Sequence, residues 1–314
     1  MIKRIIKKSG IGKILLFAVL VLAMATAAEP VLRPSSVRSC TNAVSAFRKL
    51  PENSIDVIAF GSSRVWRGIN TPILCDEFGF SAYNFGTNWQ KLNTTELYVE
   101  EALKTQSPKV ALVEVRNVAR LTRNKAFCGE LYATRALPWT HRKLSYLHWA
   151  LKLEPAEILS YLFPVFSTHS SWTDLFFPPR ELVSVPQLLA DRGSFIDERA
   201  KNVTPVTFGN HSVQRELGKG SRTALDRIVS LFKQKGTDVI LYLTPCTGRF
   251  YHSGALEEYA REKGCTYLDG FKHLEEIGLD PQTDFSDKSH LNENGSRKMT
   301  RFLGNYIREH YDLG

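Results

Sequence analysis

Residues 55–63 read IDVIAFGSS, and this stretch decides the fold class. Ile55–Phe60 is a short apolar run rich in β-branched side chains, which is typical of a strand buried in a parallel sheet. The run leads directly into Gly61-Ser62-Ser63. A strand-to-helix turn at this point would expose a serine hydroxyl at the edge of the sheet.

Strand-like and helix-like segments alternate along the rest of the chain. Further strands are expected at 81–85, 110–115, 238–243 and 266–268. Helices are expected at 37–50, from 71 onward, and at 92–105, 222–235, 256–263 and 291–310. This alternation predicts a three-layer α/β/α fold of the flavodoxin-like type, with a parallel sheet of about five strands. Binding and catalytic groups then collect at the carboxyl ends of the strands.

Three regions follow from this pattern. Residues 1–28 are expected to be a signal peptide or signal anchor, and 29–52 a linker with a short helix. Residues 53–314 form the catalytic domain, with an insertion at about 118–215 after the third strand. The insertion is rich in aromatic residues and proline. Four roles remain open for it: a substrate lid, a partner surface, a membrane-interface contact or additional core.

The first thirty residues, MIKRIIKKSGIGKILLFAVLVLAMATAAEP, are typical of an export segment. A basic start precedes an uncharged apolar run from Ile14 to Ala28, which places the N-terminus in the cytoplasm and the body outside it. Ala25-Thr26-Ala27 fits a cleavage site of the small-x-small type. The protein is therefore expected at the outer side of the cell membrane, held by an anchor, or alternatively secreted.

Composition narrows the function classes. The chain has 314 residues, 23% charged and 43% hydrophobic, which indicates a globular protein. The net charge is +9, but no basic run interleaved with aromatics occurs, so a nucleic-acid partner is not expected. The five cysteines show no zinc-like spacing, so neither a metal site nor another cofactor is expected. Cys246 and Cys265 fall at opposite edges of the sheet and should not form a disulfide.

Two short motifs carry chemistry. One is Gly61-Ser62-Ser63, and the other is Asp287-Lys288-Ser289-His290, just before the last helix. A serine becomes a nucleophile when a base lies within hydrogen-bond reach and a carboxylate orients that base. The D-x-x-H spacing lets one turn of chain present both the carboxylate and the imidazole. The onset of a helix also offers backbone N–H groups to an oxyanion.

These motifs, at these places in an alternating α/β pattern, resemble the SGNH/GDSL hydrolase superfamily over about 53–116 and 220–312. The resemblance makes Ser63 the nucleophile, His290 the base and Asp287 its orienting group. Ser62 stands where the family usually has an aspartate. The G-S-S variant and the long insertion are similar to envelope-associated members that act in teichoic-acid D-alanylation and alginate acetylation. The resemblance thus implies acyl-ester chemistry on a cell-envelope polymer.

The middle blocks of the family pattern differ in this chain. Residues 84–89, NFGTNW, resemble the block N-x-G-x-x-G, with Trp89 in place of the glycine whose N–H usually lines the oxyanion hole. The block G-x-N-D is missing. The candidates for oxyanion donors are Gly86, Asn88, Trp89 and Asn117. Arg64 and Arg116 are candidates for binding an anionic substrate, with a surface or salt-bridge role as the alternative.

The expected function is therefore an esterase or O-acyltransferase acting on an extracytoplasmic glycopolymer. Its expected partners are a cell-envelope polysaccharide or wall polymer and a membrane-bound acyl-transfer protein. The alternative keeps the fold but drops the chemistry, as a glycan-binding or envelope-assembly protein with a decayed site. The sequence leaves open which acyl group is moved and whether water or a sugar hydroxyl accepts it.

Overall fold

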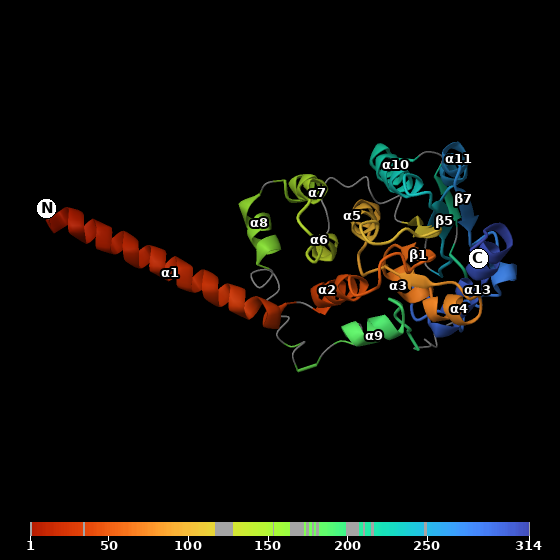
Figure 1. Ribbon diagram of the computed structural model, residues 1–314, viewed down its shortest axis with the longest axis horizontal. Helices are drawn as coiled ribbons and strands as arrows, with labels where there is room; N and C mark the ends of the chain where they lie inside the picture. Colours follow the sequence, from red (N-terminus) through yellow and green to blue (C-terminus); the bar gives the residue numbers. More distant parts are fainter. Residues whose placement is uncertain are drawn as a thin grey trace.

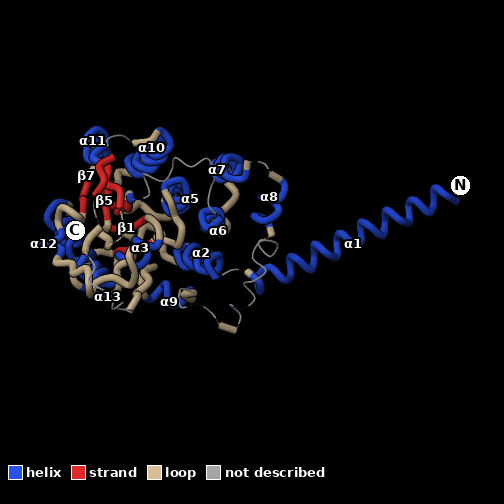
Figure 2. Tube along the Cα trace, turned by 180° about the vertical axis from the view of Figure 1, so that it is seen from behind, coloured by secondary structure: helices blue, strands red, loops and turns tan. Residues whose placement is uncertain are grey.

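A computed structural model of the chain describes residues 2–33, 35–116, 128–152, 154–163, 173, 176–177, 179, 182–198, 207–209, 211–214, 217–247 and 250–313. It consists of a body built around a parallel sheet and a long N-terminal helix that projects from one end of that body (Figures 1 and 2).

The central sheet has five strands, and all neighbouring strands are parallel. They are β1 (Val57–Phe60), β2 (Ala82–Asn84), β3 (Val110–Glu114), β5 (Asp238–Leu243) and β7 (Thr266–Asp269), in the order β2-β1-β3-β5-β7. The order reverses between β1 and β3. In open sheets of this kind, ligands bind beyond the carboxyl ends of the strands at such a reversal.

Helices cover both faces of the sheet, which confirms the three-layer α/β fold (Figure 1). Alternate residues of β1 enter separate cores, with Ile58 and Phe60 in one and Val57 and Ala59 in the other. Outside the insertion, the helices that supply the first core are α2 (Ser35–Phe47), α5 (Leu92–Ala102), α10 (Lys219–Lys233) and α11 (Gly254–Lys263). Those that supply the second are α3 (Ser63–Gly68), α4 (Thr71–Asp76), α12 (Leu274–Ile277) and α13 (Glu293–His310).

The described parts of the predicted insertion contain regular structure of their own. These elements are α6 (Cys128–Thr134), α7 (His141–Leu151), α8 (Pro155–Leu162), α9 (Val185–Ala190) and β4 (His211–Gln214). Strand β4 pairs in parallel with β6 (Phe250–Ser253), which follows the fourth strand of the main sheet. The sequence did not predict this second sheet, because neither short segment carries the apolar run of a buried strand.

Parts of the insertion belong to the core, in line with the additional-core alternative: Leu131, Tyr146 and Tyr161 are buried in the same cluster as Phe60, and residues 192–195 pack on β2 and α3. The N–H of Asn84, in β2, donates to the carbonyl of Arg192 at 2.9 Å. Gly193 lies so close to the same strand that an added Cβ would stand 2.0 Å from the carbonyl oxygen of Asn84. Phe195 packs on Trp66 of α3 with ring centroids 4.8 Å apart. Residues 192–195 therefore brace the strand and the helix that hold the serine motif.

The N-terminal helix α1 (Ile2–Leu32) contains an apolar span, Gly10–Glu29, that is long enough to cross a membrane. A signal sequence has the same length and composition, so this helix fits both a signal peptide and a signal anchor. Within the described residues the cysteine prediction is confirmed, because Cys246 and Cys265 do not form a disulfide with each other.

Candidate active site

Ser63 is the first residue of α3, immediately beyond the end of β1. Gly61 makes the turn at φ +154, where an added Cβ would stand 2.5 Å from Cγ2 of Val65. Its N–H donates to Oε1 of the buried Gln90 at 2.7 Å, and Gln90 in turn donates to the carbonyl of Phe85 at 3.1 Å. The turn is thus tied to the loop after β2. As the first helical residue, Ser63 has no acceptor for its N–H inside the helix.

The second motif is held by a short closed loop before α13. A bridge between Phe285 and Leu291 closes it, together with a hydrogen bond of 3.0 Å from the N–H of Ser286 to the carbonyl of His290. Inside the loop, Oδ1 of Asp287 accepts the N–H groups of Ser289 at 2.7 Å and of His290 at 3.1 Å. The carboxylate therefore orders the backbone that carries the imidazole.

The fold brings the two motifs together as a Ser–His–Asp triad. Oγ of Ser63 lies 2.7 Å from Nε2 of His290. Nδ1 of the same ring lies 2.7 Å from Oδ2 of Asp287 and 2.9 Å from its Oδ1. These are hydrogen-bond distances, and each ring nitrogen has the partner that the catalytic roles require. Both Ser63 and His290 are partly exposed, so a substrate can reach them.

The charges around the triad favour an ionised Asp287. Partial burial of this carboxyl opposes its ionisation, but hydrogen bonding and attraction to His290, the N–H of Ser289 and the positive charge of Arg67 outweigh that effect. Together they hold the pKa of Asp287 well below its usual value. Arg67 is itself buried and paired with the buried Asp197 at 3.0 Å. A permanently ionised carboxylate can then orient the imidazole and stabilise its protonated form.

The oxyanion candidates differ in their backbone conformation and in the contacts that they make. The N–H of Gly86 donates to Oδ1 of Asn84 at 2.9 Å, and an added Cβ would stand 2.8 Å from the backbone N of Trp66. Gly86 is therefore needed for close packing against α3, and its N–H is already engaged. This corrects its assignment as an oxyanion donor.

Trp89 adopts the left-handed conformation, with φ +65, that glycine adopts most easily. The loop therefore keeps a glycine-like geometry despite the bulky side chain, at a cost of about 1 kcal/mol for an L-residue. Asn88, its neighbour, is half-buried, and its carbonyl accepts a long contact of 3.8 Å from the thiol of Cys40. Asn117 lies outside the described residues.

The arginine candidates lie beside a carboxylate that sequence reasoning missed. Glu114 is buried at the carboxyl end of β3, and an added Cβ on Gly61 would stand 3.0 Å from its Cβ. Burial raises the pKa of Glu114 to about 7, although the positive charge of the buried Arg64 and the N–H of Thr244 oppose the rise. The N–H of Arg116 contacts Oε1 of Glu114 at 3.3 Å. The positive charge of Arg64 therefore acts on the buried carboxyl of Glu114, next to the turn that carries Ser63.

The sequence gives only a weak signal for Gln90 and Glu114. Each is a polar residue at the end of a strand or in the loop that follows it, which is where sites form in this fold. No cluster of three or more His, Cys, Asp or Glu side chains suited to a metal occurs among the residues that the structure describes.

No family model matches the chain, and no curated protein matches it. The case for a function therefore rests on the fold and on the geometry of the triad.

Proposed function

We propose that this protein is a serine esterase or O-acyltransferase that acts on an extracytoplasmic glycopolymer. Ser63 is the nucleophile, His290 the general base and Asp287 the orienting carboxylate. The observation that carries the proposal is the continuous hydrogen-bonded series from Ser63 Oγ through His290 to Asp287, with both links at 2.7 Å.

The reaction follows from this geometry. Oγ of Ser63 attacks the carbonyl carbon of an acyl ester while Nε2 of His290 takes the hydroxyl proton. The tetrahedral oxyanion would be stabilised by backbone N–H groups, for which Ser63 and Trp89 are the candidates. Collapse expels the alcohol, which receives the proton from His290, and leaves an acyl group on Ser63. Water or a sugar hydroxyl then attacks the acyl-enzyme while His290 removes its proton. Collapse of the second tetrahedral intermediate breaks the bond between the acyl carbon and Oγ of Ser63, which takes the proton back from His290 and releases the acid or the new ester.

The choice of an envelope substrate has separate support. The apolar span Gly10–Glu29, preceded by a basic segment, would hold the body at the outer face of the membrane. Wall polymers at that surface bear acyl esters and are the proposed substrate, with a membrane-bound acyl-transfer protein as the corresponding partner; phospholipid esters are a third, minor option. On this proposal α1 is retained as an anchor. The sequence alone also allows cleavage after Ala27 and secretion.

A glycan-binding protein with a decayed site remains the second candidate, because the block G-x-N-D is missing and Trp89 replaces a glycine. Labelling with a fluorophosphonate probe separates the two functions. The probe forms a covalent adduct only with an activated serine, so the wild-type chain and the Ser62→Ala variant should be labelled. Ser63→Ala and His290→Ala should not be.

Peptide mapping of the adduct would place the label on Ser63. Labelling that survives in Ser63→Ala would contradict the assignment of the nucleophile. A wild-type chain that is folded and remains unlabelled would favour the binding protein instead.

A further inference from the structure

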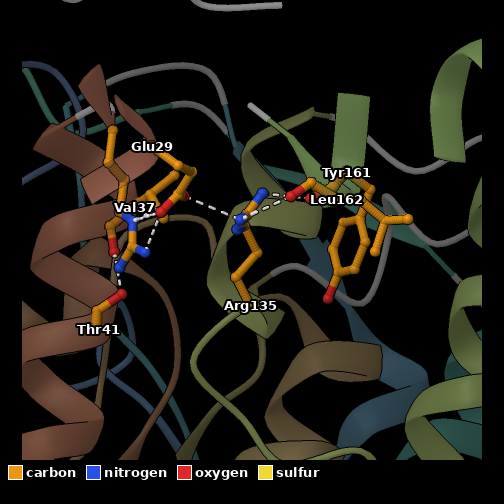
Figure 3. A network of polar contacts seen from close by, with 7 residues as sticks. Glu29, Val37, Thr41, Arg135, Tyr161 and Leu162 are labelled. Carbon is orange, nitrogen blue, oxygen red and sulfur yellow. Dashed lines mark hydrogen bonds and ion pairs between the residues drawn. The ribbon is translucent and has the colours of Figure 1, made fainter. Parts of the chain in front are cut away.

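The end of the apolar span is joined to the body by a partly buried ion network. Glu29, the last residue of the span, is only 8% exposed. Its carboxylate accepts from Nε of Arg33 at 2.9 Å and from Nη2 of Arg135 at 3.0 Å. Arg135 also donates to the carbonyls of Tyr161 and Leu162, at the end of α8 (Figure 3). One guanidinium thus joins the end of the span to the end of α8.

One side of helix α8 presents apolar residues outward, while Ile158 and Tyr161 pack against the core. Ala156, Leu159 and Leu162 recur every three residues, so they lie along one side of the helix, and all three are exposed. Leu159 and Leu162 are 47% and 45% exposed, whereas Tyr161 is buried. A helix on a water-facing surface usually presents charged and polar residues there instead.

The neighbouring segment adds aromatic and basic groups. Trp139, just before α7, is 60% exposed, and Leu144 and Trp149 on α7 are 54% and 40% exposed. The ammonium group of Lys143 is buried and lies 4.4 Å from the centre of the Trp139 ring, so it holds that ring from the protein side and does not reach the surface. Lys152, at the end of α7, is exposed. Tryptophan together with lysine is the combination found where proteins meet the headgroup region of a bilayer.

We infer that these residues form a membrane-contacting surface, which we call the α7–α8 face. It consists of Trp139, Leu144, Trp149, Leu159 and Leu162. The face lies on the outer leaflet of the same bilayer that α1 enters, with its apolar side chains in the interfacial region. The inference rests on the proposed retention of α1 as an anchor.

The position of the α7–α8 face relative to the bilayer surface favours lipid over a protein partner. A span of twenty residues, Gly10–Glu29, matches the hydrocarbon thickness of a bilayer, so Glu29 must lie at its surface. The end of α8 is bonded through Arg135 to that same residue, so it lies at the same level. In Figure 1, α7 and α8 lie at the end of the body where α1 joins it. Exposed leucines at this level contact lipid without further rearrangement.

Photo-cross-linking of the full chain in lipid vesicles tests this surface. p-Benzoylphenylalanine is placed at Leu159 or at Leu162, in vesicles of phosphatidylcholine and phosphatidylglycerol. Lys235, an exposed residue beyond α10, is the control position, and Leu20 within the span reports whether α1 is embedded. Positions 159 and 162 should give phospholipid adducts by mass spectrometry, severalfold more than position 235.

The outcomes separate the inference from the proposed chemistry. Adducts at position 20 without an excess at 159 and 162 would overturn the α7–α8 face while leaving the anchor in place. Cross-linked dimers at 159 in place of lipid adducts would assign the face to a second copy of the chain and overturn it as well. Absence of adducts at position 20 would overturn the anchor and the face together. Fluorophosphonate labelling of Ser63 in the same vesicles reports on the chemistry independently.

Discussion

Replacing Glu114 with glutamine removes a buried titratable proton and keeps the shape of the side chain. Glu114 is 3% exposed, and its Oε2 makes no hydrogen bond within the described part of the chain. Burial raises the pKa of this carboxyl from its ordinary 4.5 to about 7, against the opposing effects of Arg64 and of the N–H of Thr244. Tyr242, also buried on β5, faces the same carboxyl.

The folded chain binds the proton of Glu114 more tightly than the unfolded chain does, and this difference sets how stability changes with pH. Below pH 4.5 both the folded and the unfolded chain carry the proton, and its contribution to stability is fully present. As the pH rises to about 7, the unfolded chain releases the proton first, so the free energy of unfolding falls. The pKa difference corresponds to a loss of up to about 3 kcal/mol. The variant Glu114→Gln has no such proton, so it should gain that amount relative to the wild type between pH 4.5 and pH 8.

Urea unfolding of the full chain in detergent, followed by tryptophan fluorescence at pH 5 and pH 8, measures this difference. Glu258→Gln, at an exposed position on α11, is the matched control and should leave the pH dependence unchanged. A difference between Glu114→Gln and the wild type that is the same at both pH values would refute the reasoning, because Glu114 would then not titrate in this interval.

Three further outcomes are expected. Ser63→Ala should lower the kcat for p-nitrophenyl acetate by at least about 10³-fold, while Ser62→Ala, which removes no triad group, has a small effect; the reverse result would shift the nucleophile by one residue. Asp287→Asn should lower the Tm at pH 5 and should cost progressively less as the pH falls below 3.8, because the lowered pKa of Asp287 keeps the carboxylate's contribution intact above its ordinary value and loses it at lower pH. Gly193→Ala should lower the Tm more than Gly236→Ala, because both have positive φ but only at Gly193 does the added Cβ meet the backbone, 2.0 Å from the carbonyl of Asn84; equal losses would show that the contact relaxes without cost.

The order of elements and the two motifs could be predicted from the sequence. Buried parallel strands read as continuous apolar runs, so the segments at 55–60, 110–115 and 238–243 stand out locally. The two motifs are local as well, because Asp287 and His290 are three residues apart and Ser63 follows directly on a strand. Pairing of the serine with the histidine came from the resemblance to a family with the same two motifs.

Other features depended on contacts between distant parts of the chain. The hydrogen bond from Ser63 to His290 joins residues 227 positions apart, and the ion pair of Arg67 with Asp197 joins residues 130 apart. The same is true of the packing of 192–195 on β2 and of the pairing of β4 with β6. The burial of Glu114 and the engagement of the Gly86 N–H also appear only when the sheet and α3 are assembled. Such contacts depend on which surfaces the whole chain brings together, whereas strand and helix patterns depend only on the spacing of neighbouring side chains.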